Sequence, residues 1–71
     1  MSDYHEQFIL PNNVINNEVT SDKSLDELTD IVRNKMQTAI DNKTLISIKG
    51  SKKAQLFDPR NLIVFEIEKI K

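Results

Sequence analysis

Few side chains in this 71-residue chain could perform chemistry, and their spacing supports no particular reaction. His5 stands near Asp3 and Glu6, but a structural zinc site needs three or four well-placed ligands, and the chain has one histidine and no cysteine. Glu66 and Glu68 are two residues apart, which places them on one face of a strand, where paired carboxylates can serve acid–base catalysis. Neighbouring lysines offer both carboxylates simple ion pairs in solvent. We therefore expect no catalytic residue, no metal site and no enzyme.

The composition excludes other classes of site and structure. A single glycine rules out the GxGxxG and GxxxxGKS/T loops that hold nucleotide phosphates, so no cofactor is expected. The absence of cysteine excludes disulfides and fits a reducing compartment. No apolar run reaches the roughly 20 residues of a membrane span, and the polar N-terminus is unlike a signal peptide. These features favour a cytoplasmic protein with no membrane contact.

Lysines at one turn provide the main alternative function. Lys49, Lys52 and Lys53 surround Gly50, and Arg60 follows in the next turn. A basic hairpin can enter the major groove and neutralise phosphates, as in a nucleic-acid-binding or regulatory accessory protein of phage or plasmid type. However, the sequence pI is about 5.7. We favour the simpler interpretation that these lysines form a solvated surface and protect a hairpin from aggregation.

The charges divide unevenly along the chain. Residues 1–41 carry three basic and eight acidic side chains, a net of −5, whereas residues 42–71 carry seven basic and three acidic, a net of +4. Such asymmetry can mark a nucleic-acid face, but we favour the simpler explanation that the acids line the start of a helix and the lysines lie at hairpin edges.

A capped helix over residues 24–41 is the clearest local prediction. Ser24 and Glu27 have the spacing of a capping box, and Asn42 suits a left-handed helix end. Apolar residues recur at helical spacing and form one stripe: Leu25, Leu28, Ile31, Val32, Met36, Ala39 and Ile40.

Three strands are predicted after the helix. Residues 44–49 and 53–57 are expected to pair around a Gly50-Ser51 turn, and a type I turn over residues 58–61 leads into a strand over 62–70. The predicted fold class is α+β: one amphipathic helix packed on a three- to four-stranded antiparallel sheet, order (β)-α-β-β-β. Residues 21–71 form this domain.

Residues 1–20 are predicted to form an N-terminal arm or short strand. Residues 1–7 look frayed, and Pro11 and several asparagines interrupt the apolar residues that follow. We expect one short strand, or two fragments of one, within residues 7–20.

The C-terminal strand has more apolar residues than one covered face needs. Ile63, Phe65 and Ile67 form one row, which we assign to the core, so lysine at Ile63 or Phe65 should unfold the domain. The remaining apolar residues are predicted to form an exposed interface patch: Leu45, Phe57, Leu62 and Val64.

A second copy of the chain is the expected partner at this patch. A chain of this length buries only a marginal core, and without disulfides or metals oligomerisation is the remaining support. We therefore predict a small protein–protein interaction module of homodimeric type. The alternatives are that the N-terminal segment folds over the patch or that another protein binds it. Lysine, asparagine and isoleucine are abundant, and their codons are rich in A and T, which suggests a bacterial, prophage or plasmid source. If another protein binds the patch, we therefore expect it to be a host or phage protein.

Overall fold

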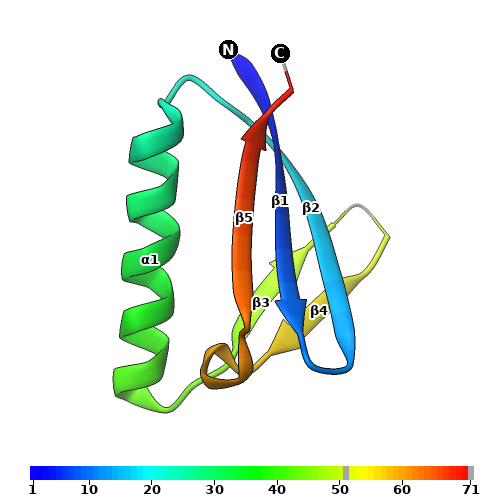
Figure 1. Ribbon diagram of the computed structural model, residues 1–71, viewed down its shortest axis with the longest axis vertical. Coiled ribbons are helices and arrows are strands. Elements are labelled where there is room, and N and C mark those ends of the chain that lie inside the picture. The colour runs from blue at the N-terminus through cyan, green and yellow to red at the C-terminus, as the bar shows by residue number, and fades with distance from the viewer. Residues whose placement is uncertain (51, 71) are drawn as a thin grey trace.

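The chain folds into an α+β structure in which one helix packs against antiparallel strands (Figure 1). The structure is a computed structural model and describes residues 1–50 and 52–70. Two strands precede the helix and three follow it. Along the chain the elements are β1 (Ser2–Leu10), β2 (Asn13–Ser21), α1 (Leu25–Asn42), β3 (Ile46–Lys49), β4 (Ala54–Phe57), the 3-10 helix η1 (Pro59–Asn61) and β5 (Val64–Lys69). The predicted fold class is confirmed.

The N-terminal residues form a long hairpin that belongs to the core of the fold. Strands β1 and β2 contain nine residues each and pair antiparallel along their whole length. The expectation of a frayed segment over residues 1–7 and one short strand within 7–20 is therefore wrong. Tyr4, Glu6 and Phe8 alternate on the buried face of β1. A carboxylate at the middle position interrupts the apolar pattern by which such a strand is normally recognised.

Strand β5 pairs with β1 and not with β4, so the three strands that follow the helix do not form the single sheet that was predicted. The larger sheet has the order β2-β1-β5, and β3 and β4 form a separate two-stranded sheet. Between β4 and β5 the predicted type I turn is a short 3-10 helix, capped by the Asp58 side chain, which accepts a hydrogen bond from the Arg60 amide. This turn carries the chain from the hairpin back to the sheet, where Phe65 lies opposite Phe8.

The helix follows its prediction closely. Ser24 caps it, and both hydrogen bonds of the capping box with Glu27 are present, at 3.2 and 3.1 Å. At the other end the helix includes Asn42, and Lys43 instead takes the left-handed conformation (φ 56°). The amide of Lys43 donates a hydrogen bond to the Ile40 carbonyl. The left-handed residue that ends the helix is therefore Lys43, one residue after the predicted Asn42.

The core lies where the helix, the hairpin β3–β4 and the inner face of the larger sheet meet. The Phe8 ring lies between the rings of Phe57 and Phe65, with centroids 5.1 and 4.9 Å away. Ile15 is the most deeply buried side chain, at 1% exposed. Phe8 and Ile15 both come from the N-terminal hairpin, so this hairpin supplies the centre of the hydrophobic core.

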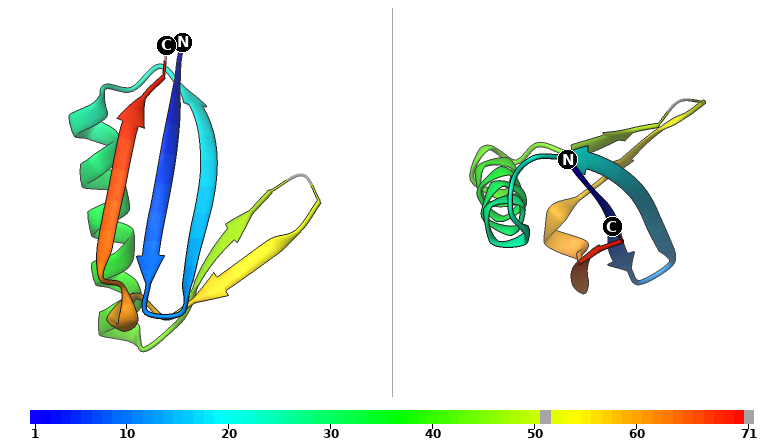
Figure 2. Two further views of the ribbon diagram at one scale, coloured as in Figure 1. Left: turned by 45° about the vertical axis from the view of Figure 1, so that its right-hand side comes forward. Right: turned by 90° about the horizontal axis from the view of Figure 1, so that it is seen from above.

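Strands β3 and β4 are shorter than predicted and diverge from the larger sheet toward their turn (Figure 2). Ile46 lies opposite Phe57 at the buried end of the pair, and Lys49 lies opposite Ala54 near the turn. Ser51, the second residue of the predicted turn, lies outside the described residues. Within the described part of the chain, no helix has both the length and the apolar character needed to cross a bilayer.

Candidate functional site

The structure does not bring the four predicted interface residues together. Phe57 is only 5% exposed and belongs to the core, and Leu62 is half-buried against it. Leu45 is exposed just before β3, and Val64 is exposed on the outer face of the larger sheet. The predicted patch therefore separates into two core residues and two unconnected surface residues.

The two rows predicted for the C-terminal strand are also only partly present. Phe65 and Ile67 are half-buried, but Ile63 is 62% exposed and lies before the strand begins. Leu62, which ends η1, lies against the core instead of on an exposed strand face. Residues 62 and 63 therefore belong to the connection between η1 and β5 and not to the strand. The two-row prediction was wrong for them because it assumed one continuous strand from residue 62.

The outer face of the larger sheet is mostly polar. Its one apolar row crosses the three strands at Val14, Ile9 and Val64, which lie directly opposite one another. Polar side chains cover the rest of the face: Asp3, His5, Gln7, Asn16, Glu18, Thr20, Glu66 and Glu68. Several of them bond across strands, as Thr20 does to Asp3 at 2.8 Å. Such a face is stable in water and needs no second layer.

The basic residues that favoured nucleic acid occupy two separate places. Lys49, Lys52 and Lys53 are exposed around the turn of the β3–β4 hairpin, whereas Arg60 lies in η1 at the base of that hairpin (Figure 1). Arg60 forms an ion pair with Asp58 at 2.8 Å. The hydrogen bonds from the Arg60 side chain and amide lower the pKa of the Asp58 carboxyl. Arg60 is thus engaged within its own turn, and the three lysines remain as the basic cluster.

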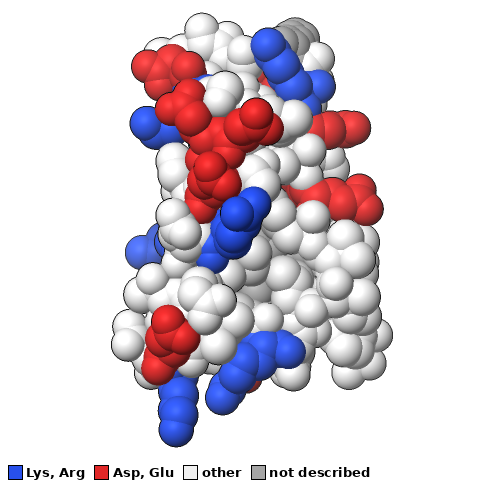
Figure 3. Space-filling model, turned by 60° about the vertical axis from the view of Figure 1, so that its left-hand side comes forward, with Lys and Arg blue, Asp and Glu red and all other residues white. Residues whose placement is uncertain are grey.

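The charge asymmetry of the sequence is partly explained by the helix. Acidic side chains gather around the N-terminal part of α1, and basic side chains project at its other end (Figure 3). Asp26 and Glu27 lie in the first helical turn, where carboxylates interact favourably with the helix dipole. Hydrogen bonds from the Ser24 amide and side chain lower the pKa of Glu27. These acids therefore have a structural role that does not require a partner.

Strand β2 is one of the two edge strands of the larger sheet, and its outer edge pairs with no other strand among the described residues. The carbonyl of Asp3 in β1 accepts a hydrogen bond from the Ile70 amide, which lies just beyond β5. The backbone groups of odd-numbered β1 residues therefore point toward β5, and those of even-numbered β1 residues point toward β2. By the same alternation, the even-numbered residues of β2 direct their backbone groups to the open edge. The Asn13 side chain accepts from the Val14 amide, at 2.9 Å. Within the described residues, no hydrogen bond is found for the amides of Asn16, Glu18 and Thr20.

The other edge of this sheet, β5, is less suited to pairing. Glu66, Glu68 and Lys69 are three of its six residues, and charged side chains are a common protection of edge strands. Two copies paired antiparallel about Ile67 would place Glu66 opposite Glu68 of the partner subunit, which is repulsive. By contrast, Glu18 is the only charged residue among the nine residues of β2.

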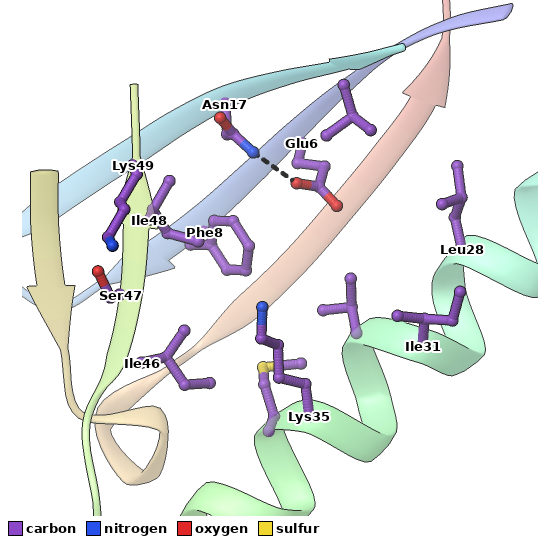
Figure 4. Close-up of a pocket in the computed structure, with 13 residues that line it drawn as sticks. Glu6, Phe8, Asn17, Leu28, Ile31, Lys35, Ile46, Ser47, Ile48 and Lys49 are labelled. Atoms are coloured by element: carbon purple, nitrogen blue, oxygen red, sulfur yellow. Dashed lines mark hydrogen bonds between the residues drawn. The ribbon is translucent and has the colours of Figure 1, made fainter. Parts of the chain in front are cut away.

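A cavity of about 520 Å³ lies between α1, β3 and the inner face of the larger sheet (Figure 4). Glu6 and Asn17 from the sheet line it, and the Asn17 amide donates to Oε1 of Glu6 at 2.9 Å. Glu6 is only 6% exposed. The sequence interpretation considered Glu6 only beside His5 and Asp3 as a metal ligand, and it missed the burial of this residue because it assigned residues 1–7 to a frayed end. The alternation of Tyr4, Glu6 and Phe8 was the available signal that Glu6 shares their face.

No family model matches the chain, and neither a curated protein nor a solved structure is significantly similar to it.

Proposed function

We propose that this protein is a small protein–protein interaction module that self-associates by pairing β2 with the β2 strand of a second copy. The observation that carries this proposal is the open edge of β2: a nine-residue strand with a single charged side chain and outward-facing amides. Unpaired backbone groups of this kind are a template for adding another strand. The predicted route through the C-terminal strand has weaker support, because Leu62 and Phe57 pack against or within the core.

One antiparallel register satisfies the side chains on both faces. With Asn17 opposite Asn17 of the partner subunit, Asn16 and Glu18 lie opposite each other across the two-fold axis and exchange backbone hydrogen bonds. On the inner face, Ile15 then lies opposite Val19 of the partner subunit. This register pairs no like charges, whereas shifting the centre to Glu18 would set two carboxylates face to face.

The proposal is tested by comparing Asn16→Pro with Asn16→Ala. Both variants lose the side chain that contacts His5 at 2.9 Å, but only proline removes an outward amide, and β1 pairing is untouched because that amide faces the edge. In sedimentation equilibrium at micromolar concentration we expect dimers for the wild type and Asn16→Ala, and a folded monomer for Asn16→Pro. A monomeric wild type, or a dimeric Asn16→Pro, would contradict the proposal.

The register has its own test, because the chain has no cysteine. In the proposed pairing Asn17 lies opposite its own copy at a position without backbone bonds, where Cα atoms are about 4.5 Å apart, within disulfide range. Mild oxidation should therefore crosslink Asn17→Cys and leave Thr20→Cys, on the same strand, uncrosslinked. Efficient crosslinking of Thr20→Cys alone would indicate a different register.

A second candidate function, binding of nucleic acid, is supported by the three exposed lysines around the projecting hairpin turn, Lys49, Lys52 and Lys53. Three phosphate contacts would make the logarithm of duplex DNA affinity fall with the logarithm of salt concentration, with a slope of about −2.7. We expect Lys52→Gln with Lys53→Gln to reduce this slope, and Lys23→Gln, distant in sequence and on another loop, to leave it unchanged. Absence of binding at low salt would exclude this function.

A further inference from the structure

A buried carboxylate faces the cavity between α1 and β3, and from it we propose that the cavity binds a small amphipathic cation. The ammonium or guanidinium group of the ligand would contact Glu6, and its hydrocarbon part would lie against the apolar walls. At about 520 Å³ the cavity lies within the usual range of small-molecule sites. This inference does not rest on the proposed self-association, which uses the free edge of β2, whereas the cavity lies on the inner face of the sheet.

The polar end of the cavity has one acceptor without a partner. Oε1 of Glu6 accepts from Asn17, whereas Oε2 points away from Asn17 on the side of the helix (Figure 4). Among residues 1–50 and 52–70, no lysine or arginine nitrogen lies within 4.0 Å of this carboxylate. Burying a carboxylate is costly unless it is paired and fully hydrogen-bonded. A cationic group supplies both a charge and donors.

Access to this oxygen is through the cavity itself. In the described part of the chain, every side-chain polar atom that is fully inaccessible has a hydrogen-bond partner. Oε2, which has none, is therefore reachable, although the whole residue is only 6% exposed. A ligand group of the size of an ammonium would contact this oxygen from the cavity.

The walls of the cavity determine the rest of the ligand. They are formed mainly by hydrocarbon from the sheet, the helix and β3: Phe8, Leu28, Ile31, Val32, Met36 and Ile48. Ile31 is 46% exposed although it belongs to the apolar stripe of the helix. An unbranched alkyl chain would cover these groups and gain hydrophobic stabilisation in proportion to the area it buries.

Two lysines of the protein stand at the same cavity and compete with such a ligand. Lys35 extends from α1 toward the cavity, and Lys49 lies on β3 (Figure 4). Both are exposed, so their ammonium groups keep their hydration. A ligand cation that brings its own hydrocarbon chain gains burial that these side chains do not, and removal of Lys35 should favour it by removing a like charge.

The test is an NMR titration of the full chain with three probes of equal chain length: octylammonium, octanol and octanoate. We expect saturable octylammonium binding, with amide shifts at Glu6, Asn17 and Ile48, and about tenfold weaker binding of octanoate. Glu6→Gln keeps the shape of the side chain and its bond from Asn17. It should reduce octylammonium affinity about tenfold, to that of octanol.

Lys35→Met is the companion variant, because it changes the charge of the cavity without touching the buried carboxylate. Lys35→Met should stay folded and bind octylammonium more tightly than the wild type. If Glu6→Gln does not fold, this variant alone tests whether the cavity favours a cation. Equal binding of the three probes, no saturable binding below the micelle concentration, or weaker octylammonium binding by Lys35→Met would overturn the proposal.

Discussion

Strands β1 and β5 lie side by side in one sheet, yet their side chains are buried to very different depths. The β1 segment mixes charged and polar residues with apolar ones, but Tyr4, Glu6 and Phe8 are all buried. Residues 62–67, which include most of β5, contain five apolar residues among six, but no residue of β5 is buried. Its inward-facing Phe65 and Ile67 are only half-covered.

The difference follows from position in the sheet. Strand β1 is central and has a neighbour on each side, whereas β5 is an edge strand with one neighbour. A side chain on a central strand is covered by flanking side chains as well as by the layer above it, so even a carboxylate is buried there. Apolar composition therefore identifies a strand, but the order of strands decides how deeply each is buried.

The largest expected effect compares Phe8→Ala with Phe65→Ala. Phe8 is 2% exposed and contacts two other rings, so truncation should cost about 3–5 kcal/mol of unfolding free energy. That approaches the whole stability of a domain of this size, so Phe8→Ala should show no cooperative urea transition by circular dichroism. Phe65→Ala should stay folded with roughly half the loss. Equal losses would contradict the contrast between the strands, and Phe8→Leu offers a milder control.

An intermediate effect is expected at the start of β1. The Tyr4 hydroxyl donates to the Lys23 carbonyl at 2.7 Å, which ties this strand to the loop before the helix. Tyr4→Phe should lower the unfolding free energy by about 1 kcal/mol, because it leaves that carbonyl without its donor. Ser2→Ala, on the same strand, should be close to neutral. A neutral Tyr4→Phe in urea unfolding would mean that the N-terminal end of β1 is frayed after all.

The smallest effect is expected where the sequence predicted a large one. Ile63→Lys should change the unfolding free energy by about 0.5 kcal/mol or less, because this side chain is 62% exposed. Val64→Lys, at 40% exposed, should behave similarly. Phe65→Lys is the matched control and should be strongly destabilising, since it places a charge against the core. Unfolding by Ile63→Lys would restore the predicted core row.

The sequence predicted the elements that follow Ser24 better than their arrangement. The helix and its capping box are confirmed, and β3, β4 and β5 lie inside their predicted ranges. The pairing of β5 with β1 was not predicted, because β1 itself was assigned to a frayed end. Of the predicted interface residues, Leu45 and Val64 are exposed, and Phe57 and Leu62 are placed in or against the core. The burial of Glu6 at the cavity and the open edge of β2 were both missed.

Local sequence patterns were sufficient for the features that depend on neighbours a few residues away. The Ser24–Glu27 capping box, the helical stripe and the Asp58–Arg60 turn are examples, since their hydrogen bonds join residues two to four apart. The pairing of the strands, the open edge of β2 and the position of Glu6 at a cavity became apparent from the three-dimensional fold. These depend on contacts between distant segments, such as Phe8 with Phe65, and no local pattern specifies such a partner.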